Sequence, residues 1–204
     1  MTLENAKTIQ KAATRDQFRK LILDNASALL TKEGPHALSM RKLSEQVGAS
    51  TIVLYTYFKD KQDILNELYV EGFTRLQRDL EAVAPGADPV LHLMALGRAY
   101  RRSAVANSTY YQIMFSRCIE GFTPSADSLE KSKTCFTVLR QGVQRCADGG
   151  LVLPGSVSRT AQVLWATLHG VISLELFGYL GTNKGNEALL EQALQTIAAG
   201  MTRR

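Results

Sequence analysis

The chain is poor in the residues from which metal sites, disulfide frameworks and nucleophilic active sites are built. Among 204 residues there are three cysteines and three histidines. No CxxC pair occurs, the odd number of cysteines disfavours a disulfide framework, and His36, His92 and His169 lie far apart in the sequence. The patterns GxSxG, GxGxxG, HExxH and the P-loop are also missing. The sequence therefore predicts a protein that is not an enzyme and that holds no metal and no cofactor.

A long hydrophobic run is missing as well. A helix that spans a membrane needs about 20 predominantly apolar residues in succession. The apolar run VISLELFGYL has only ten residues, which is too short. The first fifteen residues, MTLENAKTIQKAATR, are polar and slightly basic, and they contain no apolar segment of a secretory signal. We therefore expect a cytoplasmic protein without membrane contact.

Signals for β-hairpins are absent, and apolar residues recur instead at the three- and four-residue spacing of helices. Residues that can begin helices are Thr14 with Gln17, Ser39, Ser50, and Asp60 with Asp63. These patterns predict an all-α fold of about nine helices. The predicted helices lie near residues 14–33, 39–47, 50–58, 60–80, 89–105, 108–118, 125–147, 156–180 and 187–202.

One segment of this helical sequence looks like a strand. The octamer TIVLYTYF (51–58) is rich in β-branched and aromatic residues, which favour strands. Yet it follows a short helix that Gly48 can end, and two short helices joined by such a turn match a helix-turn-helix motif. Its second helix can be held by packing rather than by propensity, with Leu54 and Phe58 as inward anchors. The residues left on or near the outer side are Thr51, Ile52, Val53, Tyr55, Thr56 and Tyr57.

The chemistry of that outer side suits a DNA major groove. Methyl groups pack on the thymine methyl, and hydroxyl groups bond to base edges or phosphates. Lys61 adds a cation beside the N-terminus of the next helix, where a phosphate can bind. Residues 1–61 contain ten Lys/Arg and six Asp/Glu, a net charge of +4, while residues 62–204 carry +1. The sequence thus predicts DNA binding, and the alternative is that Tyr55 and Tyr57 are half-buried packing aromatics.

The segments LSEQVGAS (43–50) and LYTYFKDK (54–61) resemble the DNA-binding region of TetR-family transcriptional regulators. The resemblance implies that Tyr55 meets bases and backbone, and that Tyr57 and Lys61 hold phosphates. It also implies that residues 51–53 face base edges and that Arg41 reaches a base or a phosphate. The complete predicted set is Arg41, Ser50, Thr51, Ile52, Val53, Tyr55, Tyr57 and Lys61.

Two residues depart from the family pattern. Ile52 stands where many members have Gly or Pro, which points to a different base step, one with thymine. Ala49 replaces the usual Val, which only thins a core contact. For Arg41 and Ile52 taken singly, a solvated or packing role competes with a base contact.

A second resemblance lies in the C-terminal half. Trp165, His169 and Gly170 form a W-x-x-x-H-G pattern, and TYYQIMFS (109–116) looks like the sixth helix of the same type. Both resemble the TetR-family C-terminal domain named for its Trp-His-Gly residues (WHG). His169 can be a hydrogen-bonded core histidine or a polar handle in an apolar ligand pocket. The candidate pocket residues are Tyr110, Tyr111, Met114, Phe115, Cys118, Phe136, Trp165 and His169.

The same half of the chain is expected to associate. The family resemblance implies that the last two helices form a dimer interface, and the apolar stripe of the last helix is wide for a monomer. Gly170 would allow another helix to approach closely. Glu175, a lone acid in an apolar helix, can pair with a cationic ligand or with an arginine such as Arg98 or Arg140.

The sequence predicts a DNA-binding helix-turn-helix domain at 1–62 and a ligand-binding and dimerisation domain at 63–204. The expected function is that of a homodimeric, ligand-responsive repressor, which binds double-stranded DNA at a palindromic operator and is released by a small organic effector. Two alternatives stay open. One is a thiol-redox-responsive regulator that uses Cys118, Cys135 and Cys146, and the other is a helical interaction protein that never contacts DNA.

Overall fold

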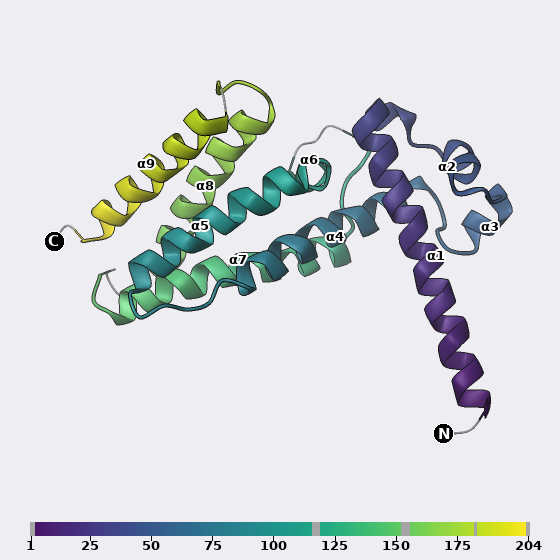
Figure 1. Cartoon of the computed structure of the whole chain (residues 1–204), viewed down its shortest axis with the longest axis horizontal. Helices are drawn as coiled ribbons and strands as arrows, with labels where there is room; N and C mark the ends of the chain where they lie inside the picture. Colours follow the sequence, from purple (N-terminus) through teal and green to yellow (C-terminus); the bar gives the residue numbers. More distant parts are fainter. Residues whose placement is uncertain (1–2, 116–118, 152–155, 182, 203–204) are drawn as a thin grey trace. The chain divides into compact units, whose positions relative to one another are not determined.

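The structure of the protein, a computed structural model, describes residues 3–115, 119–151, 156–181 and 183–202. Within these ranges it contains nine α-helices, one short 3-10 helix and no strand (Figure 1). The elements are α1 (Leu3–Glu33), η1 (Pro35–Ala37), α2 (Met40–Val47), α3 (Thr51–Tyr55), α4 (Lys61–Glu81), α5 (Pro89–Ala106), α6 (Ser108–Phe115), α7 (Ala126–Asp148), α8 (Val157–Leu176) and α9 (Asn183–Thr202). This confirms the predicted all-α class. In the part of the chain that is described, no helix is long and apolar enough to cross a membrane.

The first helix is longer than the sequence analysis predicts. The capping pattern of Thr14 and Gln17 predicts a start near residue 14, but α1 begins at Leu3 and contains Thr14 in its interior. The prediction is wrong because residues 3–13, LENAKTIQKAA, are mostly strong helix formers, and neither Gly nor Pro interrupts them. A capping pattern does not start a new helix when the residues before it already favour one.

The chain divides into two compact units. The N-terminal unit consists of Met1–Glu71 with Thr109–Ser128, and the C-terminal unit consists of Gly72–Ser108 with Leu129–Arg204. The functional division between residues 62 and 63 stays a prediction, because compactness alone does not tell which residues bind DNA or ligand.

The N-terminal unit is built on one face of α1. Ile22, Ala26 and Leu29 recur at helical spacing on that face and are fully buried. Leu54 of α3 and Phe58, in the turn after α3, are buried as well. Both residues therefore point inward, as the sequence analysis predicts.

Local capping sets both ends of α2, the first helix of the helix-turn-helix. The Ser39 Oγ accepts the backbone N–H of Lys42 at 3.2 Å, which satisfies one of the free N–H groups of the first turn. Gly48 ends the helix with φ at 67° and donates its N–H to the carbonyl of Ser44. A residue with a Cβ is strained at this φ, so glycine suits the turn between α2 and α3.

In the C-terminal unit, α5 packs against both α8 and α9. The close approach depends on Gly97 of α5, where a Cβ would lie 2.5 Å from a methyl of Leu194 and 3.3 Å from a methyl of Leu168. At Gly170, by contrast, an added Cβ would meet no atom within 4 Å. The close helix approach that the sequence suggests for Gly170 is therefore not made by the described residues of its own chain.

The tight contact at Gly97 leads to a prediction about stability. Gly97→Ala is expected to lower the free energy of unfolding by about 1–3 kcal/mol, because the new methyl group overpacks the core against Leu194. Gly200→Ala in α9 is the matched control, since its Cβ meets nothing within 4 Å and alanine favours helix by up to about 1 kcal/mol. Urea unfolding at one protein concentration measures both. Equal stability of the two variants would contradict the prediction.

Candidate nucleic-acid interface and effector site

The short helix α3 is held by its N-cap and by packing. The Ser50 Oγ accepts the backbone N–H of Val53 at 3.3 Å, which satisfies one of the free N–H groups at the start of the helix. Thr51, the first helical residue, is half-buried, and Leu54 and Phe58 are buried. A segment whose residues favour strands is thus kept helical by its cap and its tertiary contacts.

The outer side of α3 is apolar and exposed. Ile52 is 78% exposed, Tyr55 54% and Val53 39%, whereas Leu54 between them is fully buried. The Thr56 hydroxyl donates to the carbonyl of Val53 at 2.7 Å, so it is engaged within the helix. Ile52, Val53 and Tyr55 are thus available to a partner, and they lie where the sequence predicts contacts to bases.

Tyr57 follows α3 and packs on α1. The centroid of its ring lies 5.1 Å from that of Phe18, and the guanidinium of Arg15 lies 5.7 Å from the same ring. Tyr57 is half-buried, so the packing role that the sequence analysis considers applies to its ring. Tyr55 is the more exposed of the two predicted tyrosines.

Helix α4 begins with a reciprocal capping pair beside Lys61. The Asp60 Oδ1 accepts the backbone N–H of Asp63 at 2.9 Å, and the Asp63 Oδ2 accepts the backbone N–H of Lys59 at 3.1 Å. This arrangement works like a capping box, with acidic residues at both positions. It defines the start of α4, and Lys61, the first helical residue, is partly exposed there.

Arg41 lies on an exposed part of α2. Its Nε donates to the Glu45 Oε1 one turn further on, at 3.1 Å. An exposed pair of this kind contributes about 0.3–0.5 kcal/mol, so exchanging Glu45 for a phosphate or a base costs little. All eight residues predicted to bind DNA belong to the N-terminal unit.

Three of the predicted ligand residues lie together in the C-terminal unit. The ring of Trp165 on α8 lies 5.9 Å from that of Phe136 on α7 and 6.2 Å from that of His169. The Trp165 indole N–H donates to the hydroxyl of Tyr100 on α5 at 3.2 Å. We call these four residues the aromatic cluster. Tyr100 is not predictable from the sequence, because a single tyrosine in an amphipathic helix carries no signal that separates it from other core residues.

The other predicted ligand residues belong to the N-terminal unit. Tyr110, Tyr111 and Met114 of α6 are buried, and the rings of Tyr111 and Phe115 lie 4.8 Å apart. Cys118 lies outside the described residues. The predicted set is thus divided between the two units, and its joint role in one pocket stays a prediction. A small apolar pocket within the C-terminal unit contains none of the set; it is lined by Val90, Leu93, Met94, Leu164, Leu194, Ile197, Ala198 and Met201.

His169 is half-buried in the aromatic cluster, with its Nε2 3.4 Å from the Ser173 Oγ. Burial lowers the pKa of His169 below its ordinary value of 6.5. As pH falls below 6.5, the unfolded chain therefore takes up a proton at this residue before the folded chain does. The contribution of His169 to stability is full above pH 6.5 and is lost as the pH falls toward the lowered pKa.

The lowered pKa predicts that His169 accounts for part of the pH dependence of the free energy of unfolding. His169→Gln should reduce the loss of stability between about pH 7.5 and 5.5, measured by urea unfolding. Part of the loss should remain, because burial lowers the pKa of His92 as well. The exposed His36 supplies the control, His36→Gln. A His169→Gln profile that follows that of the wild type would contradict the prediction.

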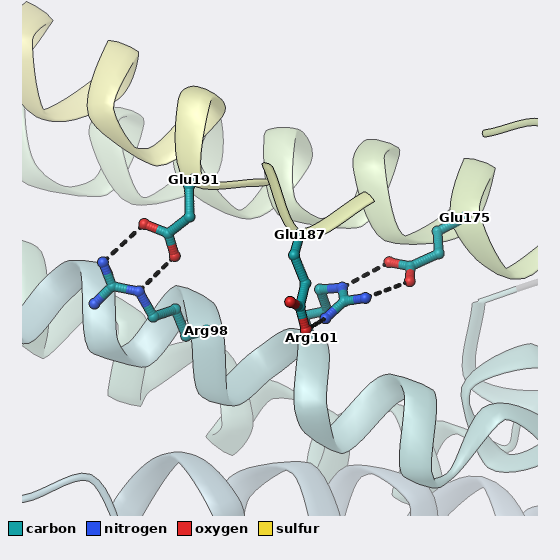
Figure 2. A network of polar contacts seen from close by, with 5 residues as sticks. All are labelled: Arg98, Arg101, Glu175, Glu187 and Glu191. Atoms are coloured by element: carbon teal, nitrogen blue, oxygen red, sulfur yellow. Dashed lines mark hydrogen bonds and ion pairs between the residues drawn. The ribbon is translucent and has the colours of Figure 1, made fainter. Parts of the chain in front are cut away.

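Glu175 is held by an arginine. Its carboxylate accepts two hydrogen bonds from Arg101 of α5, at 2.6 and 2.8 Å, and a third nitrogen of the same guanidinium donates to Glu187 of α9 at 3.0 Å. Figure 2 shows Arg101 between the two carboxylates. Glu175 is therefore neutralised within the chain, which argues against its use as the counter-ion of a cationic ligand.

The arginine that pairs with Glu175 is not one of the two that the sequence analysis named. Arg98 forms its two hydrogen bonds with Glu191 instead (Figure 2), and Arg140 is exposed. Arg101 lies three residues after Arg98, nearly on the same face of α5. The register of α5 against α8 decides between them, and the sequence does not contain that register.

The two described cysteines are poor redox sensors. Cys135 and Cys146 of α7 are free thiols and buried. Burial raises the pKa of Cys135 to about 12, and it raises the pKa of Cys146 as well. The thiolate is the reactive form, so both thiols are disfavoured as sensors. The third candidate of the thiol-redox alternative, Cys118, lies outside the described residues.

Comparison with protein families gives two matches to this chain. The profile "Bacterial regulatory proteins, tetR family" matches residues 22–68, which include α2, α3 and the start of α4. The profile "Tetracyclin repressor-like, C-terminal domain" matches residues 93–197, which is more than half of the chain. The second match includes the aromatic cluster and the arginine–glutamate network.

Individual relatives agree with these profiles. The chain is 23% identical over 201 residues to the HTH-type transcriptional regulator Rv1816 of Mycobacterium tuberculosis, with 83% of this chain and 85% of the relative covered. A crystal structure described as the regulatory protein SCO4313 is 27% identical, with a TM-score of 0.79 and coverage of 91% and 97%. The TetR-family transcriptional regulator PfmR of Thermus thermophilus shares the fold at 22% identity, with a TM-score of 0.71 and coverage of 91% and 98%.

The local geometry and the two profile matches agree. The N-terminal unit has a capped helix-turn-helix whose second helix exposes its apolar side, and the matched regions extend from this motif to α9. The predicted resemblance is therefore confirmed, and the chain belongs to the TetR family of bacterial regulatory proteins, which are DNA-binding transcriptional regulators rather than enzymes.

Proposed function

We propose that the protein is a homodimeric repressor that binds a palindromic operator and is released by a small, largely apolar effector. The exposed outer side of α3 carries the DNA-binding part of the proposal. Ile52, Val53 and Tyr55 present methyl and phenol groups to solvent, and these groups match the thymine methyl and the hydrogen-bonding edges of bases. The half-buried Thr51 begins this helix, and Ser50 caps it.

Phosphate contacts complete the proposed interface. Lys61 stands at the N-terminus of α4, where the helix dipole and the free N–H groups also attract anions. Arg41 supplies a second cation, because its exposed partner Glu45 is easily replaced. Tyr57 reaches a phosphate with its hydroxyl while its ring stays packed on α1. Such contacts set the position of the protein on the duplex, and the residues of α3 read the sequence.

Two copies of the chain are needed for a palindromic site, and α8 and α9 offer the surface for association. Val163 and Leu174 on α8 and Leu189 on α9 are exposed although they are apolar. Gly170 on α8 has free space around its Cβ position, so a helix of the second copy can approach closely. Two-fold symmetry then presents the two α3 helices to successive major grooves, about 34 Å apart.

The aromatic cluster supports the effector part of the proposal. Trp165, Phe136 and His169 supply mostly apolar surface with few polar atoms, which suits a small organic molecule. A cationic effector is disfavoured, because Arg101 already neutralises Glu175. Release requires that the effector stabilises a separation of the two recognition helices that differs from the separation the operator requires. The effector and the DNA then weaken each other's binding.

The first experiment is selection of bound sequences from a random duplex library by the purified protein. The expected result is a palindromic consensus whose half-sites lie about one helical turn apart. Binding should also weaken steeply as salt rises, because several phosphates are neutralised. Enrichment of no sequence, with only salt-sensitive background, would contradict the proposed function. A consensus without symmetry would contradict the dimer alone.

A further inference from the structure

One arginine of α1 makes three separate contacts around the turn between α3 and α4. The guanidinium of Arg19 donates to the backbone carbonyl of Tyr57 at 2.9 Å. It forms an ion pair with Glu67 of α4 at 2.8 Å and lies over the ring of Phe58, 4.4 Å from its centroid. All four residues belong to the N-terminal unit. Arg19 thus joins α1, the turn after α3 and the second turn of α4.

These contacts lie on both sides of Lys61 in the sequence, and one of them is made to the backbone of Tyr57 itself. Tyr57 and Phe58 precede Lys61 in the chain, and Glu67 follows it on the same helix as Lys61. The planar guanidinium can donate along its edge while it stacks through its face. Arg19 therefore contacts the backbone of the turn at Tyr57, the ring of Phe58 and, through Glu67, helix α4.

Arg19 itself is poorly suited to bind a phosphate. Its charge is balanced by Glu67, and one nitrogen is already engaged with the carbonyl of Tyr57. We propose that Arg19 is a positioning residue for DNA binding, which sets where Tyr57 and Lys61 lie relative to α3. This inference rests on the proposed function, because it assumes that those two residues contact phosphates.

The inference predicts a specific pattern for Arg19→Ala. Affinity for the selected operator duplex should fall about ten- to a hundred-fold, in line with losing hydrogen bonds to a charged group. Affinity for a random duplex of the same length should change little, because a displaced turn still carries its cations. The salt slope for the operator should stay that of the wild type, because no phosphate contact made by Arg19 is lost.

Arg19→Lys should restore part of the operator affinity. A lysine at this position can still pair with Glu67, but its compact ammonium cannot also stack on Phe58 and donate to the turn. Lys20→Ala is the matched control, because Lys20 is the next residue of α1, is exposed and carries the same charge. It should bind the operator nearly as the wild type does.

For Glu67→Gln, an effect of overall charge and the positioning role of Arg19 predict changes of opposite sign in operator affinity. Removing an acidic residue from a DNA-binding unit strengthens binding if only the overall charge matters. The positioning role predicts weaker operator binding instead, because Arg19 loses the partner that orients it. Asp16→Asn, at an exposed position of α1, removes the same charge and should bind the operator as tightly as the wild type or slightly more tightly.

The experiment is a fluorescence-anisotropy titration of these variants on the operator and random duplexes at several salt concentrations, with far-UV circular dichroism as the check of folding. An Arg19→Ala variant that binds like Lys20→Ala would overturn the inference, as would a salt slope reduced by about one unit per copy, which indicates a direct phosphate contact. If Arg19→Ala fails to fold, the sign of the Glu67→Gln effect decides. If the wild-type protein binds no duplex specifically, the result contradicts the proposed function rather than the role of Arg19.

Discussion

Replacing Arg101 by alanine is expected to lower the free energy of unfolding by about 3–5 kcal/mol, the cost of leaving a buried charge without its partner. The Arg101 side chain is 10% exposed and that of Glu175 only 5%. The guanidinium makes two hydrogen bonds to Glu175 and one to Glu187, so its loss leaves the Glu175 carboxylate buried and unpaired. Urea unfolding of the wild type and of Arg101→Ala at the same protein concentration measures the difference.

Arg98→Ala is the matched control for this prediction. Arg98 also forms two hydrogen bonds with one glutamate, Glu191, but the two side chains are 40% and 35% exposed. Water screens such a pair, and its loss should cost no more than about 1 kcal/mol. A combined Arg101→Met and Glu175→Leu variant should recover most of the stability, because apolar side chains can replace a buried ion pair. Equal losses in Arg101→Ala and Arg98→Ala would show that burial does not govern this network.

If the proposed function holds, Tyr55→Ala and Lys61→Ala weaken operator binding, while the fold and the proposed dimer persist. Tyr55→Ala removes the exposed phenol from α3, and a loss of about 1–3 kcal/mol, or up to a hundred-fold or so, corresponds to losing a base contact. Lys61→Ala should reduce the salt slope by about one unit for each copy bound, because one phosphate contact per copy is lost. Anisotropy titrations at several salt concentrations measure both quantities.

Lys59→Ala provides the control for charge, since Lys59 is an exposed lysine two residues before Lys61. It should leave the salt slope nearly unchanged. Tyr55→Phe separates the hydroxyl of Tyr55 from its ring, and partial binding by this variant would assign part of the contact to apolar packing on a thymine methyl. Unchanged affinity in both Tyr55→Ala and Lys61→Ala would disprove the assignment of the DNA-binding residues.

The helix-turn-helix rests on local signals, which explains why the sequence predicts its geometry. Ser50 and Gly48 act through backbone groups within a few residues of themselves, so their roles follow from residue type and position. Leu54 and Phe58 are four residues apart, as on one face of a helix, and their neighbours are polar or exposed. This spacing separates the buried side of α3 from its outer side. Strand propensity pointed the other way, but the cap and the packing outweigh it in so short a helix.

The surroundings of the candidate effector residues follow less completely from the sequence. The pattern of Trp165 and His169 places two rings on one face of α8, and both belong to the aromatic cluster. The sequence predicts neither the bond between Tyr100 and the indole of Trp165 nor the division of the other candidate residues between two compact units. They depend on which helices meet, and residue spacing within one helix carries no information about a partner 65 positions away.

The sequence by itself determined the helical class, the helix-turn-helix with its exposed apolar side and the family. All of these depend on interactions within a few residues of one another or on motifs with fixed spacing. Only the tertiary structure decided that Arg101 rather than Arg98 neutralises Glu175, and that Arg19 joins the turn after α3 to α4. Neighbouring arginines on one helix, such as Arg98 and Arg101, are chemically equivalent in the sequence. The register between packed helices decides which of them pairs with a given carboxylate.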